Sequence, residues 1–115
     1  MARTRATTSP VATTQFHILL ALADAPRYGL GIVEEVARRT DGEIRLGPGT
    51  LYTAIKKMVE GELIEEVADT SRQGLQDTRR RYYRITREGR MALRAEAERL
   101  TQWLQVARDK QVLAE

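Results

Sequence analysis

The pattern of apolar and polar positions predicts four helices. Residues 11–23 are apolar on more than one side, so we expect this first helix to be buried from several directions. Residues 29–39 separate an apolar inner face from a charged outer face, and residues 48–60 carry one apolar stripe at helical spacing. That stripe consists of Leu51, Ile55, Met58 and Val59. Residues 86–112 predict a long last helix that begins at Thr86.

Residues that break helices or form turns mark the boundaries between these elements. Pro26 cannot continue the first helix, and Asp41-Gly42 is typical of a turn after the second. Pro48 fits the first turn of the third helix, where its missing N–H costs nothing. Gly61 fits the left-handed position that closes a helix, so we expect the third helix to end there.

Three shorter stretches predict strands. Residues 43–46 alternate and predict a small strand, while residues 62–68 and 79–85 predict a hairpin around the polar tip 69–78. Three helices followed by a hairpin are the order of elements in a winged helix-turn-helix. The predicted fold class is therefore mostly α with a small β-hairpin: a winged helix-turn-helix plus a C-terminal dimerisation helix.

This interpretation divides the chain into three parts. Residues 1–10 are polar and have no periodicity, which predicts a flexible N-terminal arm. We expect residues 11–86 to form the winged helix-turn-helix DNA-binding domain and residues 87–115 to form the dimerisation helix. A length of 115 residues suits a single domain whose modest core would gain stability from dimerisation.

Composition excludes several classes of protein and site. The chain has no cysteine, which rules out disulfides and thiolate metal sites. It has no apolar run near the ~20 residues of a membrane span and no secretory signal, so we expect a soluble cytoplasmic protein without a membrane partner. Its one histidine, His17, lies in an apolar helix, and no carboxylate pair or nucleophile motif appears. We therefore expect no enzymatic activity, no cofactor and no metal site.

Positive charge is concentrated near the predicted hairpin. The net charge is only +3, but seven arginines lie between Ser71 and Arg90, against Asp77 and Glu88. This local excess is a candidate footprint for a polyanion, and the alternative is a solvated basic surface. The candidates for DNA contact from the wing are Arg72, Arg79 and Arg80. Because side chains alternate along a strand, at least one of the arginines at 79–81 should instead pair with Glu65 or Glu66.

The third predicted helix turns a polar side away from its apolar stripe. The candidates for contact with double-stranded DNA are Thr50, Tyr52, Thr53, Lys56 and Lys57. Threonine can donate to phosphate or contact a thymine methyl, and lysine adds attraction that does not depend on sequence. Two alternatives stay open, since Tyr52 would also fit a core position with its hydroxyl at the surface and Lys57 would also fit a merely solvated position.

Several motifs together resemble the PadR family of bacterial transcriptional regulators. They are "YGLGIVEEVARRT", "LGPGTLYTAIKKMVEGELIEE" and "RRRYYRITREGRMAL", and the similarity extends over most of the chain. The resemblance implies a homodimer that binds a roughly palindromic operator, usually as a repressor, with a DNA role for the residues around Tyr52 and for the wing. It also implies the short form of the family, in which a single helix follows the wing.

The last helix carries an apolar seam that suits pairing with a second subunit. The expected dimer interface consists of Phe16, Leu19, Leu93, Ala97, Leu100, Trp103, Leu104 and Ala107. The residues from Leu93 to Ala107 follow the alternating spacing of 4 and 3 that a coiled-coil seam requires. The alternative is that this helix folds back on its own domain.

Trp103 suggests a further partner. Some PadR-like proteins hold flat aromatic compounds between subunits, so the resemblance implies that Trp103, with Phe16 nearby, is a candidate effector site. The alternative is that Trp103 only packs at the interface. A different function also remains open, because the acidic pairs Glu34-Glu35 and Glu65-Glu66 would suit a winged-helix protein–protein module without DNA binding.

Overall fold

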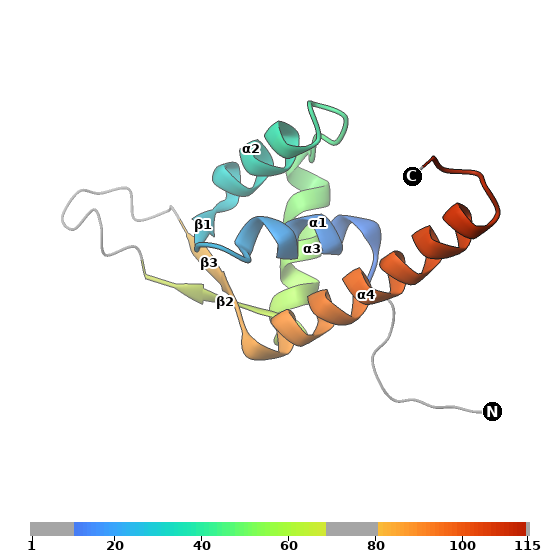
Figure 1. Cartoon of the computed structure of the whole chain (residues 1–115). Helices are drawn as coiled ribbons and strands as arrows, with labels where there is room; N and C mark the ends of the chain where they lie inside the picture. Colours follow the sequence, from blue (N-terminus) through green and yellow to red (C-terminus); the bar gives the residue numbers. More distant parts are fainter. Residues whose placement is uncertain (1–10, 69–80, 115) are drawn as a thin grey trace.

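The computed structural model describes residues 11–68 and 81–114. The helices follow one another in the order that the sequence pattern predicts, and the strands differ from it in two places described below (Figure 1). The elements are α1 (Thr13–Leu22), β1 (Arg27–Tyr28), α2 (Gly29–Arg39), α3 (Pro48–Glu60), β2 (Ile64–Val67), β3 (Tyr82–Ile85) and α4 (Arg87–Asp109). The fold is mostly helical with a small antiparallel sheet, which confirms the predicted class.

Helix α1 lies at the centre of the domain and contacts α2, α3 and α4 (Figure 1). Its buried side chains are Ile18, Leu19, Ala21 and Leu22. A helix that other elements cover from several sides needs apolar residues on several sides, as the sequence predicted. Leu19 was expected at the dimer interface, but its side chain has no exposed surface and packs in the core of its own chain. That expectation is wrong for Leu19.

Helix α3 buries one stripe against the rest of the domain. The stripe is formed by Leu51, Ala54, Ile55 and Met58. Val59 was expected to belong to it but is 39% exposed, because at 100° per residue it lies about 80° from Leu51 and reaches only the edge of the buried face. The bounds of α2 and α3 agree with the sequence prediction.

The sheet has three strands in the order β1-β3-β2, all antiparallel. The predicted hairpin is confirmed, with Ile64 opposite Ile85 and Val67 opposite Tyr82. Strand β1, which the pattern did not predict, adds Arg27 opposite Tyr83 on the other side of β3. The strand expected at residues 43–46 is absent, since these residues form no pairing within the described chain. The tip expected at residues 69–78 lies outside the described residues.

The junction between α3 and α4 is held by hydrogen bonds of the Thr86 hydroxyl and backbone. Thr86 caps α4 as predicted, because its hydroxyl oxygen accepts from the Gly89 N–H at 2.9 Å. The same hydroxyl donates to the Glu62 carbonyl oxygen at 2.7 Å, and the Thr86 N–H donates to the Leu63 carbonyl oxygen at 3.0 Å. The left-handed residue after α3 is Glu62, with φ 63°, whereas Gly61 has φ −85°. The closing position is therefore one residue later than expected.

Helix α4 packs on α1 with its first half and extends past the domain with its second half (Figure 1). Ala92 and Glu96 are buried, and the Glu96 carboxylate accepts from the Val11 N–H and pairs with Arg99. The helix ends at Asp109, earlier than the predicted 112. None of the helices in residues 11–68 and 81–114 combines the length and apolar character that a membrane span requires.

Candidate nucleic-acid interface

All five residues expected to face DNA on α3 are exposed, but they point in three directions. At 100° per residue, Lys56 and Thr53 lie on the side opposite the buried stripe, and Thr53 is turned toward α1, where it lines a groove. Thr50 and Lys57 lie on one flank of the helix, beside the start of α1. Tyr52 lies on the other flank, beside the start of α2. The polar side of α3 is therefore broad enough to contact both the floor and the edges of a DNA groove.

Tyr52 is both exposed and in contact with its own domain. Its side chain is 51% exposed, and its hydroxyl end lies against the Cα of Gly29, the first residue of α2. The first turn of a helix has N–H groups without intrahelical partners, which suit an anion such as phosphate. The Tyr52 hydroxyl thus lies where it and the N–H groups at the start of α2 can bind the same anion. With half of its side chain exposed, Tyr52 is not a core residue, and its contact with DNA stays a prediction.

Tyr83, in strand β3 of the wing, is buried. Burial raises the pKa of the Tyr83 hydroxyl, and the nearby Glu66 carboxylate raises it further, while the Arg81 guanidinium acts in the opposite direction. The hydroxyl therefore stays protonated at neutral pH. Tyr83 belongs to the core and is not a site for DNA contact.

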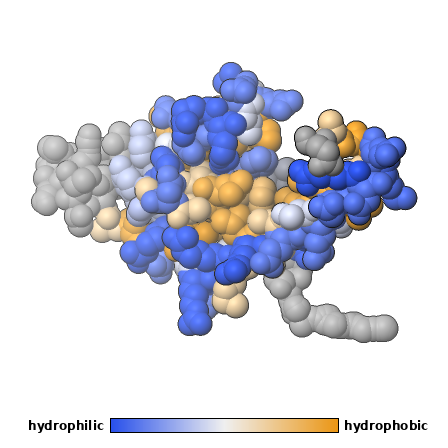
Figure 2. Space-filling model, viewed as in Figure 1, coloured by the Kyte–Doolittle hydropathy of each residue, from blue (hydrophilic) through white to orange (hydrophobic). Residues whose placement is uncertain are grey.

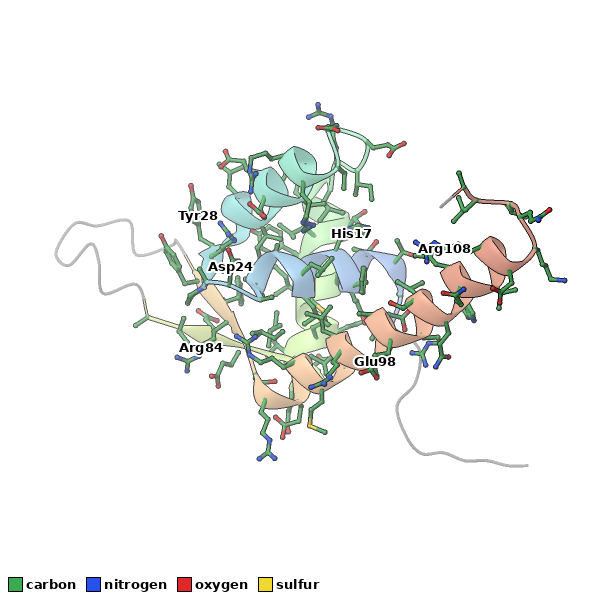
Figure 3. The ribbon with its side chains drawn as sticks, in the orientation of Figure 1. His17, Asp24, Tyr28, Arg84, Glu98 and Arg108 are labelled. Carbon is green, nitrogen blue, oxygen red and sulfur yellow. The ribbon has the colours of Figure 1, made fainter. Side chains whose placement is uncertain are left out.

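The root of the wing is neutralised by ion pairs. Arg81 lies 3.6 Å from the Glu66 carboxylate, and Arg84, which Figure 3 labels, lies 2.6 Å from the Glu65 carboxylate. The expectation that one of the three consecutive arginines pairs with Glu65 or Glu66 is confirmed for Arg81. Arg72, Arg79 and Arg80, the wing residues expected to contact DNA, lie outside the described residues.

The residues of the expected dimer interface fall into two groups. Leu93 packs against the core of its own chain, and Phe16, Leu100 and Ala107 are half-buried. Ala97 is exposed, as are Trp103 and Leu104, at 61% and 46%. Figure 2 shows an apolar surface over α1, between the hydrophilic outer faces of α2 and α4. The fold-back alternative thus describes the first half of α4, and the second half leaves its seam uncovered.

His17 lies on the side of α1 that faces α2 (Figure 3). Burial lowers the pKa of its imidazole, and the Arg39 guanidinium lowers it further. Its Nδ1 is buried without a hydrogen-bond partner among the described residues, and its ring contacts Phe16 edge-on at a centroid distance of 5.7 Å. No group of three or more potential ligands in the described residues is placed to hold a metal ion.

Two polar residues near the start of α1 were not singled out from the sequence. Thr14 and Gln15 of α1 line a shared groove with Thr50, Thr53 and Lys57 of α3. The available signal was that the helix begins with three polar residues, Thr13, Thr14 and Gln15, before its apolar part. The direction in which they point depends on how α1 crosses α3, and periodicity carries no information about that crossing.

Comparison with known proteins connects this geometry to a family. The model of the transcriptional regulator PadR-like family matches residues 18–95, which include the helix-turn-helix, the wing and the first half of α4. The chain belongs to the PadR-like family. The resemblance found in the sequence is thus confirmed. Because this family comprises transcriptional regulators, the expectation that the protein is not an enzyme is confirmed as well.

Individual relatives agree with this assignment. The chain is 32% identical over 90 residues to an uncharacterized protein, protein X, of Lysinibacillus sphaericus, covering 77% of this chain and 76% of the relative. A PadR family transcription regulator from Clostridium difficile has a similar structure, with a TM-score of 0.70, 25% identity, and coverage of 87% of this chain and 99% of that one. PcaV of Streptomyces coelicolor, a transcriptional regulator solved with its natural ligand, shares the fold at a TM-score of 0.69 and 24% identity. The match with PcaV covers 90% of this PadR-family chain and 64% of PcaV.

Proposed function

We propose that this PadR-family protein represses transcription by binding a roughly palindromic DNA operator as a homodimer. Helix α3 enters the major groove of each half-site, and the wing lies beside it. The observation that carries this proposal is the division of α3, which buries Leu51, Ile55 and Met58 and exposes Thr53 and Lys56 on the opposite side. A helix held in this way presents polar groups to a groove at fixed positions. A repressor acts on the chromosome, so the proposal includes a cytoplasmic location.

The residue types suit the positions that they occupy. Thr53 and Lys56, at the centre of the exposed face, are placed to read or contact base edges, while Tyr52 on one flank is placed to bind a backbone phosphate near the start of α2. Thr50 and Lys57 contribute from the other flank. Arg72, Arg79 and Arg80 remain proposed phosphate contacts from the wing.

The second half of α4 supports the homodimer. Trp103 and Leu104 are largely exposed on a helix that projects beyond its own domain, and Val106 beside them is 49% exposed. Pairing of two such helices along the seam of Ala97, Leu100, Leu104 and Ala107 would remove this apolar surface from water. Phe16 adds to the same surface from the apolar side of α1. The dimer also supplies the two-fold symmetry that a palindromic site requires.

A small aromatic effector is part of the proposal for Trp103. At the dimer seam this indole would offer a flat face on which an aromatic ring can stack, and Phe16 would lie close by. Titration of the intrinsic fluorescence of the single tryptophan with planar aromatic compounds tests this point. Quenching that saturates, and that weakens in Phe16→Ala, which keeps the tryptophan, supports an effector site, whereas the absence of quenching by a broad panel contradicts it.

Selection of bound duplexes from a random pool tests the central proposal. We expect enrichment of a palindrome whose half-sites are centred about 10 bp apart, and an affinity that falls steeply as salt is raised. Sedimentation should show a dimer at micromolar concentration. If no duplex binds at low salt while the protein is folded and dimeric, the chain is a winged-helix protein–protein module and the proposal is wrong.

A further inference from the structure

A groove of about 390 Å³ separates the first half of α3 from the start of α1. Its polar lining residues are Thr14 and Gln15 from α1 and Thr50, Thr53 and Lys57 from α3. The three α3 residues follow one another at i, i+3 and i+7, so they form one row along the helix. This row is the edge, on the side nearest α1, of the α3 face that is proposed to contact DNA.

The polar side chains in this groove are not used by the protein itself. Thr40, Thr86 and Thr101, elsewhere in the described chain, each donate their hydroxyl hydrogen to a backbone carbonyl oxygen. The hydroxyls of Thr14, Thr50 and Thr53, and the amide of Gln15, make no hydrogen bond within the part of the chain that the structure describes. These groups are available to a ligand.

The charge in the groove selects the kind of ligand. None of the described residues that line it is acidic, and Lys57 has no carboxylate partner among the described residues. The first turns of α1 and α3 both contain no acidic residue, and neither helix has a side-chain cap. Hydroxyl, amide and ammonium donors around an unneutralised groove match the oxygens of a phosphate.

We propose that this groove holds a phosphate of the DNA backbone, which makes the start of α1 part of the DNA interface and Thr14 and Gln15 positioning residues for recognition. The inference rests on the proposed function and extends it to an element outside the helix-turn-helix and the wing. A phosphate held here fixes one strand against the α1 flank of α3. Thr53 and Lys56 are then set at one depth and angle in the major groove.

The test places a negative charge inside the groove and compares it with the same charge just outside. Gln15→Glu introduces a carboxylate among the groove residues, whereas Thr13→Glu introduces it two residues earlier, at an exposed position that does not line the groove. Glutamate in a first turn favours helix formation, so both variants are expected to fold. Fluorescence anisotropy with a duplex selected by the wild-type protein is measured between about 50 and 200 mM salt.

We expect Gln15→Glu to bind that duplex about three- to tenfold more weakly than Thr13→Glu does, and to reduce the salt slope by about one. Thr14→Lys, with Thr13→Lys as its control, should strengthen binding by a similar factor. Equal affinities and slopes for Gln15→Glu and Thr13→Glu would overturn the inference. Failure of the wild-type protein to bind any duplex would instead overturn the proposed function.

A free anion is the other source of phosphate chemistry, and a separate measurement distinguishes it. Thermal unfolding is followed with sodium phosphate and with sodium chloride at equal ionic strength. If phosphate stabilises the wild-type protein but not Gln15→Glu, and Gln15→Glu binds the duplex as Thr13→Glu does, the groove is a site for free phosphate and the DNA assignment is wrong. No phosphate-specific stabilisation, together with weaker binding of the duplex by Gln15→Glu, supports the backbone phosphate.

Discussion

The phenol ring of Tyr52 lies across the Cα of Gly29, so the second helix begins underneath a side chain of the third. A Cβ on Gly29 would stand 3.1 Å from Cζ of this ring and closer still to its hydroxyl oxygen. The same ring is half exposed on the proposed DNA face. Its position therefore depends on the absence of a side chain at residue 29.

Gly29→Ala is expected to destabilise the protein by about 1 kcal/mol, at the low end for overpacking, because the added methyl displaces the half-exposed Tyr52 ring. Urea unfolding measures this cost. Gly31→Ala is the matched control, since its nearest neighbouring atoms would be 3.5 Å from the new Cβ, an ordinary contact in the same helix. In a Tyr52→Ala background the cost of Gly29→Ala should largely disappear. If the cost stays the same there, the ring is not the obstacle.

Gly89 and Gly61 are expected to respond in opposite ways to alanine. A Cβ on Gly89 would stand 2.8 Å from Cγ1 of Ile85 and 3.0 Å from the carbonyl carbon of Leu63, and backbone there cannot move aside easily. Gly89→Ala should therefore cost about 2 kcal/mol or more in the free energy of unfolding. Gly61 has φ −85° and room for a Cβ, so Gly61→Ala should stabilise by about 0.5 kcal/mol. Destabilisation by Gly61→Ala would show that Gly61 is the left-handed closing residue after all.

His17 is expected to make stability depend on pH near neutrality. Because burial and Arg39 lower the pKa of its imidazole, the unfolded chain binds a proton more readily than the folded one. Stability should fall as pH drops below the usual histidine pKa of about 6.5, toward the lowered pKa of the folded state. His17→Gln removes this slope, which urea unfolding at several pH values measures.

The carboxylate of Glu96 titrates in a different window. Its pKa is lowered, chiefly by the hydrogen bond from Arg99, so its contribution is present above the usual carboxylate pKa and is lost only in more acidic solution. The two effects are therefore separable. A wild-type protein that keeps the same slope as His17→Gln between about pH 7 and 5 would contradict the assignment to histidine.

The wing arginines are expected to differ in how much each contributes to the salt dependence of DNA binding. Arg79→Ala with Arg80→Ala is expected to weaken binding to all duplexes alike and to lower the salt slope by about one for each phosphate that is no longer neutralised. Arg84 pairs with Glu65, so Arg84→Ala should change the slope by much less. Anisotropy at several salt concentrations compares these variants. An unchanged slope in the double variant would mean that the wing points away from DNA.

Leu104 should control the oligomeric state. Leu104→Glu places a charge in the exposed seam of α4 and is expected to cost about 2 kcal/mol or more of association free energy. Gln102→Glu adds the same charge on the opposite side of the helix, about 160° away, and should leave the dimer intact. Sedimentation across a concentration series distinguishes them. Equal dissociation of both variants would remove the seam from the interface.

The sequence predicts those parts of the fold whose boundaries have local causes. The ends of α2 and α3 follow from the turn at Asp41-Gly42 and from Pro48, which act on neighbouring residues. Strand β1 was missed because two residues carry no periodicity, and its partners are more than fifty positions away in β3. The stretch 43–46 alternates like a strand but has no strand beside it among the described residues.

Assignments that depend on which element covers a surface were less predictable. Leu19 is apolar in the way that an interface residue is, and only the packing of α1 against its own domain shows that it is already buried. The exposed α3 residues were identified by helical periodicity, which is local, whereas the groove with Thr14 and Gln15 results from a helix crossing that no single segment encodes.

In the proposed dimer on DNA, the hydrogen bonds at the junction of α3 and α4 determine the distance between the two copies of α3. Thr86 holds the first turn of α4 to the two residues that follow Gly61, and Gly89 leaves no slack between them. In a dimer joined through α4, each α3 helix is thus held rigidly to the α4 helix of its own subunit. A small rotation of one α4 helix against the other therefore produces a larger change in the distance between the two α3 helices. DNA binding in this dimer can then be regulated without a change in any contact to a base. It is enough that the distance between the two α3 helices no longer matches one turn of the duplex, about 34 Å.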